Sequence, residues 1–239
     1  MRCAEARRLA RTLETPDEDD PIRWALAAAH AWRELAACSH ASGDRSGRED
    51  ALARAALAFQ RLAERLQAET EGHPLVDVTV ISEGILTAWA AGRDDVAAAL
   101  GRLPTQRYRP RGRAKPDEPL MYATFALASA ARGNALARDR AIANAREAIA
   151  AGRTTDLTQA RGMIAPLLDA LEAVARGRAR PLQRALTKLV RYHRWRCREA
   201  ETADALLDIT TTGLGRWAAR HQVVSGFVDP LVAPPEAAG

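Results

Sequence analysis

The sequence predicts an all-α protein, in which about nine or ten helices form one array of antiparallel αα-hairpins with solenoid-like packing. Aromatic residues make up only 5% of the 239 residues and alanine is abundant, a composition that favours close helix–helix contact over a β-sandwich. Apolar residues recur with a period near 3.6 in most segments, and the interruptions between segments are short. Short connections imply antiparallel neighbours, so we expect a single helical domain over residues 1–239.

The N-terminal part of the chain has clear helix signals. Asp20 followed by Pro21 is a strong start, because an Asp side chain caps free backbone N–H groups and proline suits the first turn. Residues 39–49 contain two glycines and several small polar residues, so we expect a loop there. The helices predicted on either side of these signals cover residues 2–14, 21–39 and 50–69.

Residues 75–92 carry the one ambiguous pattern. Val76, Val78 and Val80 alternate as they would in a strand, yet no second strand candidate lies nearby. An isolated strand leaves its backbone hydrogen bonds unsatisfied, so a helix is the favoured interpretation. A short helix is expected next, over residues 93–103.

The C-terminal part predicts two pairs of helices and a final helix. Pro166 lies inside one of them and predicts a kink or a break near Met163, because proline removes a backbone hydrogen bond. The predicted helices cover residues 118–132, 134–151, 156–176, 181–199 and 202–220. A tail rich in proline, glycine and alanine occupies residues 225–239.

The helix predicted over residues 181–199 has an apolar side and a basic side. Nine cations and no carboxylate fall between Arg176 and Arg198. At 100° per residue, one side carries Leu182, Leu186, Leu189, Val190, His193 and Cys197. The other side carries Arg184, Lys188, Arg191, Trp195 and Arg198. Trp and Arg often anchor protein interfaces, so the basic side is a candidate contact surface.

A second basic run lies in the loop expected over residues 105–116. Its candidate contact residues are Tyr108, Arg109, Arg111 and Arg113. The net charge is +5, and because neither basic run contains an acid, the remainder of the chain is acidic overall. Such segregation suits an acidic protein partner or a phosphate backbone, and an ordinary solvated basic face is the alternative.

The cysteines and the apolar runs bear on the compartment. Cys3, Cys38 and Cys197 are far apart, odd in number and without metal-ligand spacing. We therefore expect neither a disulfide framework nor a zinc site, and a reducing cytosol is the simplest compartment. The N-terminus lacks the apolar stretch of a secretory signal, and no run approaches the ~18 apolar residues of a membrane span.

No catalytic or cofactor-binding motif stands out. The acids in residues 17–20 are better explained by helix capping than by metal binding. The string from Gly213 to Ala218 matches GxGxxA, but the strand and βαβ unit of a dinucleotide site are missing. His193 lies in the centre of an apolar face, so we expect a hydrogen-bonded core histidine. The sequence predicts no enzyme, no cofactor and no metal site.

The order of several stretches resembles the immunity 49 family. These stretches are TAWAAGRDDVAAALGRLP (87–104), DEPLMYATFALASAARGN (117–134), RPLQRALTKLVRYHRWR (180–196), LLDITTTGLGRWAARHQV (206–223) and FVDPLVAPP (227–235). The resemblance covers roughly residues 50–234 and is one of order and spacing. The sequence departs from the family pattern in its basic 107–115 loop and in its tail.

This resemblance implies an all-helical bacterial immunity protein, not an enzyme, that stays in the cytoplasm and neutralises a cognate toxin by binding it. It assigns no contact residues, so the basic loop and the basic helix side remain the candidates. If the toxin is a nuclease, its basic groove favours contact through acidic residues 14–20 instead. The main alternative is a nucleic-acid-associated helical protein, and an all-α enzyme without a recognised motif is the third hypothesis. The oligomeric state is left open.

Overall fold

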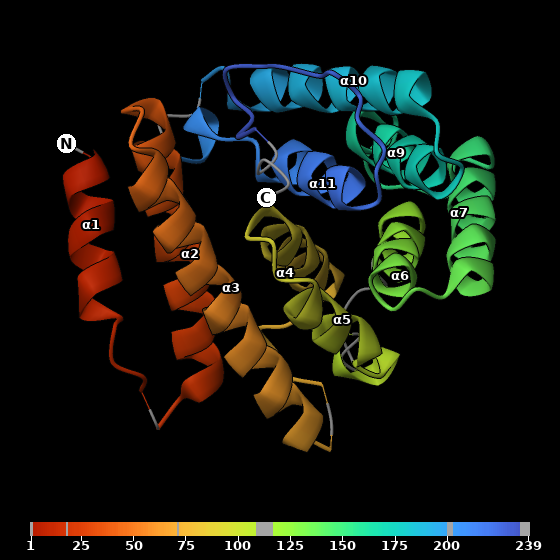
Figure 1. The fold of residues 1–239 in the computed structure, drawn as a ribbon. Coiled ribbons are helices and arrows are strands. Elements are labelled where there is room, and N and C mark those ends of the chain that lie inside the picture. The colour runs from red at the N-terminus through yellow and green to blue at the C-terminus, as the bar shows by residue number, and fades with distance from the viewer. Residues whose placement is uncertain (1, 18, 71, 109–116, 200–202, 235–239) are drawn as a thin grey trace.

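Helices form the regular structure of this chain (Figure 1). The structure, a computed structural model, describes residues 2–17, 19–70, 72–108, 117–199 and 203–234. No strand occurs within these ranges, so the all-α prediction is confirmed. No helix in the described part of the chain is long and apolar enough to cross a membrane. The solenoid-like stacking of hairpins stays a prediction.

The N-terminal helices are α1 (Arg2–Thr12), α2 (Pro21–Ala41) and α3 (Arg45–Ala68). Helix α2 packs against both α1 and α3. Its Asp20 cap is confirmed, since the carboxylate accepts the N–H of Arg23 at 3.1 Å. The loop expected over residues 39–49 is wrong in extent, because Asp44 caps the N–H of Gly47 at 2.9 Å. That cap starts α3 five residues earlier than expected.

The central helices are α4 (Val78–Ala90) and α5 (Asp94–Arg102). The ambiguous stretch is therefore helical, as favoured from the absence of a partner strand. Asp77 supplies the start, because its carboxylate accepts the N–H groups of Thr79 at 2.8 Å and Val80 at 3.1 Å. After α5 the chain makes a 3₁₀ turn over Thr105–Arg107.

Two helix pairs follow, as predicted. Helix α6 (Glu118–Ala131) packs on α7 (Ala135–Ala150), and α9 (Ala165–Ala175) packs on α10 (Ala179–Cys197). A single turn, α8 (Leu157–Gln159), and a π-helical turn (Ala160–Ile164) lead into α9. The π turn ends two residues before Pro166 and includes Met163, so the helix is irregular where a kink or a break was predicted.

Helix α11 (Ile209–Arg220) starts seven residues later than expected. A 3₁₀ turn over Ala203–Leu206 precedes it, and the buried Asp208 begins the helix by accepting the Thr211 N–H at 3.0 Å. The described part of the tail folds back onto this point. The Asp208 N–H donates to the Leu231 carbonyl at 2.8 Å, and Arg194 donates to both carboxylate oxygens of Asp229.

Helix α11 packs against α4, although more than one hundred residues separate them in the chain (Figure 1). The rings of Trp89 and Trp217 stack there with their centroids 4.5 Å apart. Gly213 lies so close to α4 that an added Cβ would be 2.3 Å from the Leu86 carbonyl oxygen. In the GxGxxA string, Gly213 thus serves close helix packing.

We expect Gly213→Ala to lower the free energy of unfolding by about 2 kcal/mol. The new methyl group would meet backbone atoms of Leu86, which cannot rotate away, so α11 must move off α4. Gly215→Ala is the matched control, because nothing lies within 4 Å of the Cβ it would gain. Since alanine favours helix, the control should gain roughly 0.5–1 kcal/mol. Equal effects in urea unfolding would contradict this interpretation.

A buried polar network joins α3, α11 and the tail. Arg216 is 3% exposed and donates to both carboxylate oxygens of Glu49, each at 2.6 Å. It also donates to the carbonyls of Ala90 and Pro234. Arg48 donates to the same carboxylate of Glu49 at 2.6 Å. Burial opposes ionisation of Glu49, but the hydrogen bonds and charges of these two arginines prevail and lower its pKa.

Cys3 and Cys38 form a disulfide between α1 and α2, with their Cα atoms 5.6 Å apart. The expectation of three unpaired cysteines is therefore wrong for this pair. The hairpin of α1 and α2 brings together residues that are 35 positions apart, and spacing along the chain did not reveal this. Cys197 has the free thiol that was expected.

Candidate functional site

The basic side of α10 faces solvent. We call Arg184, Lys188, Arg191, Trp195 and Arg198 the basic face, and all five are exposed. The opposite side of the helix is buried from Leu182 to His193, with Cys197 half-buried at its end. The indole of Trp195 is 49% exposed and lies against Tyr192, with ring centroids 5.6 Å apart. A large aromatic side chain therefore lies between cations on a rigid helix.

Most cations of the basic face have weak partners or none. Within the described ranges, neither Arg184 nor Arg191 forms an ion pair. The Lys188 ammonium lies 4.0 Å from Asp169, at the limit of an ion pair, and Arg198 pairs with its exposed neighbour Glu199. Exposed pairs of this kind contribute little energy, so the positive charge is available to a partner.

The basic face continues into a groove between α9 and α10. The groove has a volume of about 210 Å³ and includes Arg176, Arg178, Arg184 and Lys188. Its acids are already engaged, since Arg146 from α7 bridges Asp169 at 3.0 Å and Glu172 at 2.7 Å.

The predicted basic loop is only partly described. Arg109, Arg111 and Arg113 lie outside the described residues. Tyr108 is 3% exposed and packs edge-on against Phe125 of α6, so its prediction as an exposed contact residue is wrong. Burial raises the pKa of its hydroxyl to about 12, against a small opposing effect of Arg132. The mainly apolar ring turns inward after the 3₁₀ turn.

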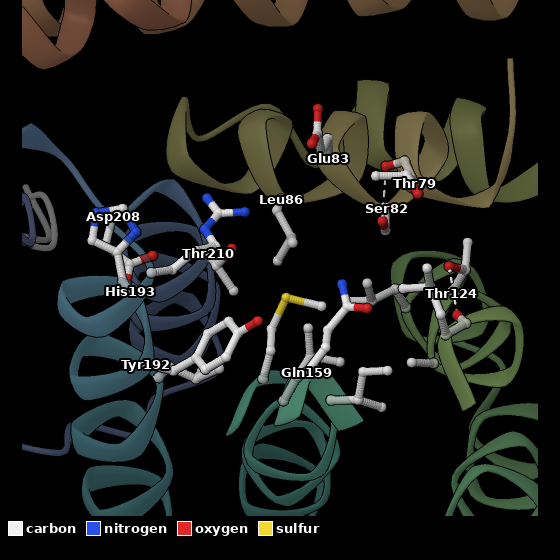
Figure 2. A pocket seen from close by; sticks show the side chains of 18 of the residues that line it. Thr79, Ser82, Glu83, Leu86, Thr124, Gln159, Tyr192, His193, Asp208 and Thr210 are labelled. Carbon is white, nitrogen blue, oxygen red and sulfur yellow. Dashed lines mark hydrogen bonds between the residues drawn. The ribbon is translucent and has the colours of Figure 1, made fainter. Parts of the chain in front are cut away.

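The inner side of α10 borders a cavity of about 120 Å³ (Figure 2). Its walls come from α4, α6, the π turn with α9, α10 and the segment that leads into α11. The floor is apolar and includes Leu86, Leu127, Ile164, Leu167 and Leu189. The polar lining includes Thr79, Ser82, Gln159, Tyr192, His193, Arg196 and Thr210. Figure 2 shows the Tyr192 hydroxyl and the Gln159 amide directed toward the middle of the cavity.

His193 is 8% exposed and lines the cavity from α10. Its inward orientation is as predicted. Its expected hydrogen bonding is not seen at Nε2, which is buried and has no partner among the described residues. The reason is that neighbouring atoms cover Nε2 without placing a polar atom at hydrogen-bond distance.

Two further features shape the cavity. Gly162 in the π turn lies under Tyr192, because a Cβ there would be 2.3 Å from the ring. Arg33 reaches the cavity from α2 and pairs with Glu83 at 2.7 Å, while its buried Nε has no partner among the described residues. Burial and the charge of Asp156 raise the pKa of Tyr192, and Arg196 opposes this.

Sequence reasoning missed this cavity as a site. Its lining comes from residues between Arg33 and Thr210, and periodicity within one segment does not show which segments meet. Two signals were present: a histidine among the leucines of α10, and Pro166 beside the π turn.

No group of three or more His, Cys, Asp or Glu side chains in the described ranges is placed to hold a metal ion. Comparisons with family models, with curated proteins and with solved structures find no match. The function of this chain is therefore inferred from its residues and their geometry, together with the order of stretches that resembles the immunity 49 family.

Proposed function

We propose that this chain is a bacterial immunity protein that binds and neutralises a cognate toxin through the basic face of α10. The observation that carries the proposal is the half-exposed Trp195 between exposed cations, two of which form no ion pair within the described residues. A toxin is the proposed partner because the order of several stretches resembles the immunity 49 family. The proposed activity is stoichiometric inhibition by binding, with no catalytic step.

The basic face contains the residue types that are common at the centre of protein–protein interfaces. A stable complex buries about 800 Å² on each partner, and a few Trp, Tyr and Arg side chains supply most of the affinity. Trp195 and Arg191 are residues of these types. Both lie on α10, whose opposite side is fixed in the core by buried leucines. Unpaired cations speed association with an acidic surface, so the partner patch is expected to carry Asp and Glu.

The compartment is part of the proposal. The resemblance implies the cytoplasm, where glutathione keeps most thiols reduced. In that compartment Cys3 and Cys38 would be held as two thiols, whereas an oxidising compartment would keep their disulfide. The redox state of this pair in the producing cell therefore reports where the protein resides.

The test is co-expression with the product of the adjacent gene. We expect rescue from toxicity and a complex that survives purification. Trp195→Ala should weaken this complex by about 30-fold, because a central Trp in an interface typically contributes 2 kcal/mol or more. Arg140→Ala is the control, since Arg140 is an exposed arginine on a different helix, α7. A toxin that is neither bound nor neutralised would overturn the proposal.

The second candidate function is nucleic-acid association through the same unpaired cations. Phosphate contacts release counterions, so the logarithm of affinity would fall steeply with the logarithm of salt concentration. The remainder of the chain is acidic overall, which would repel an extended phosphate backbone beyond the basic face. Undetectable DNA and RNA binding at about 50 mM salt would exclude this candidate.

A further inference from the structure

A second cavity, with a volume of about 330 Å³, lies between α10, α11 and the described part of the tail. None of the described residues in its lining carries a charge. The two hydroxyl groups of the lining already have partners, since Thr211 donates to Asp208 at 2.6 Å and Ser225 accepts the Phe227 N–H at 3.3 Å. The rest of the lining is apolar or glycine, and it comes from Leu186, Gly215, Ala219 and residues 223–228 and 232–234.

Hydrogen bonds outside the cavity hold the tail in place at both ends. At the first end, the Val223 N–H donates to a carbonyl of α11 at 2.9 Å. At the second end, Arg194 donates to both carboxylate oxygens of Asp229, and the Ala233 N–H donates to the Thr212 hydroxyl oxygen at 3.2 Å. The chain between these ends forms one wall of the cavity. The cavity is therefore preformed, as small-molecule sites usually are.

Gly215 leaves space open on the α11 side of the cavity. A Cβ added at Gly215 would meet nothing within 4 Å, whereas a Cβ at Gly213 would be 2.3 Å from the Leu86 carbonyl oxygen. Helix packing therefore requires the glycine at position 213 but not the one at position 215. Glycine inside a helix is less stable than alanine, so Gly215 keeps this space open without any gain in local stability.

The lining indicates a neutral apolar ligand. A charged group would enter the cavity without a counter-ion among the described residues, and burial of an unpaired charge is strongly unfavourable. The volume is roughly twice the 150 Å³ that accommodates benzene, so about ten to thirteen non-hydrogen atoms fit. Gly215 and Phe227 are half-buried, so a ligand can touch them. Val224 and Val228 line the cavity and are 71% and 90% exposed, which places its entrance beside them.

We propose that this cavity is a binding site for a neutral apolar molecule, about the size of two fused six-membered rings, held between α11 and the tail. The site is separate from the basic face, because Trp195 and Arg191 do not line it. It therefore stands whether or not the chain binds a toxin.

Quinoline, which has ten non-hydrogen atoms and is uncharged at neutral pH, is the probe. It would be titrated into the full-length protein and followed by ¹H–¹⁵N NMR. We expect saturable shifts around Gly215, Ala219 and Phe227, with a Kd on the order of 0.1 mM for a ligand of this size. N-methylquinolinium has the same rings with a permanent charge inside them, so it should bind at least tenfold more weakly.

Two variants fill the cavity. Gly215→Leu places a side chain in the open space and should weaken quinoline binding at least tenfold, while α11 stays folded because leucine favours helix over glycine. Ala219→Leu adds a side chain one turn further along the same wall and should have the same effect. Ala143→Leu is the matched control, because Ala143 is exposed on α7 and does not line the cavity. Its affinity for quinoline should equal that of the wild type.

Four outcomes would overturn the proposal. The first is the absence of saturable shifts up to about 2 mM quinoline, 20 times the expected Kd. The second is equal affinity for quinoline and N-methylquinolinium, which would remove the selection for a neutral ligand. The third is unchanged binding in the filled variants, which would place quinoline elsewhere; if Gly215→Leu fails to fold, Ala219→Leu decides this. The fourth is a dimer in sedimentation that Gly215→Leu dissociates, which would make a second copy of the chain the occupant.

Discussion

Glu49→Gln is expected to lower the free energy of unfolding by about 3 kcal/mol at pH 7. Gln keeps the shape of the side chain but removes the charge that Arg216 and Arg48 share. Arg216, with 2% of its side chain exposed, would then be a buried cation beside a second one. Loss of one partner from a fully buried pair costs 3–5 kcal/mol, and the 27% exposure of Glu49 places this pair at the lower end.

The effect of this variant is expected to depend on pH. The pKa of Glu49 in the folded protein is lowered from the ordinary value of 4.5. The stabilisation by its ionised form is therefore fully present above about pH 4.5 and is lost as the pH falls through the lower folded pKa. The difference in unfolding free energy between wild type and Glu49→Gln should shrink as the pH falls below 4.5.

The matched control for Glu49→Gln is Asp94→Asn. Asp94 of α5 pairs at 2.8 Å with Arg220, which lies on α11 as Arg216 does. Both side chains of this pair are more exposed than those of Glu49 and Arg216. Exposed pairs contribute about 0–1 kcal/mol, so urea unfolding should show a much smaller loss. Equal losses in the two variants would show that burial of Arg216 does not govern the energy of its ion pair.

Reduction of the Cys3–Cys38 disulfide is expected to lower the free energy of unfolding by about 3–4 kcal/mol. The bond closes a loop between residues 35 positions apart, and breaking it gives the denatured chain more conformational freedom. The effect in the folded state should concentrate on α1, which the disulfide joins to α2 and which buries mainly Ala6 and Ala10. Reduced protein should therefore be cleaved faster by trypsin at Arg7, Arg8 or Arg11.

This prediction is checked by unfolding and limited trypsin digestion with and without dithiothreitol. Cys3→Ser should reproduce the effect of the reductant and become insensitive to it. Cys197→Ser is the control, because Cys197 forms no disulfide, and its stability should still depend on the reductant. Identical unfolding curves and cleavage rates for oxidised and reduced protein would contradict a stabilising role of the bond.

Local chemistry explains why the sequence alone predicted the helices well. Asp20 and Asn134 cap α2 and α7, each within three residues of the N–H it accepts. The same local chemistry explains the π turn that includes Met163, since Pro166 removes a backbone N–H that would donate within this turn. Errors occurred where a cap was not identified, as at Asp44 and Asp208.

The sequence also predicted which side of α10 faces solvent, because its cations and leucines segregate at the helical period. It placed Tyr108 wrongly, because an aromatic residue in a basic stretch has the same neighbours in sequence whether it is exposed or buried. The packing of its ring against Phe125 depends on how the 3₁₀ turn meets α6.

The sequence by itself determined the helical class, most helix positions and the amphipathic character of α10, since these follow from interactions among residues a few positions apart. Only the tertiary structure decided the Cys3–Cys38 bond, the Glu49–Arg216 pair and the cavity beside His193. Glu49 and Arg216 are 167 positions apart, and such contacts depend on how whole helices pack. Helix packing is decided by shape and burial over many segments at once, which a local pattern does not contain.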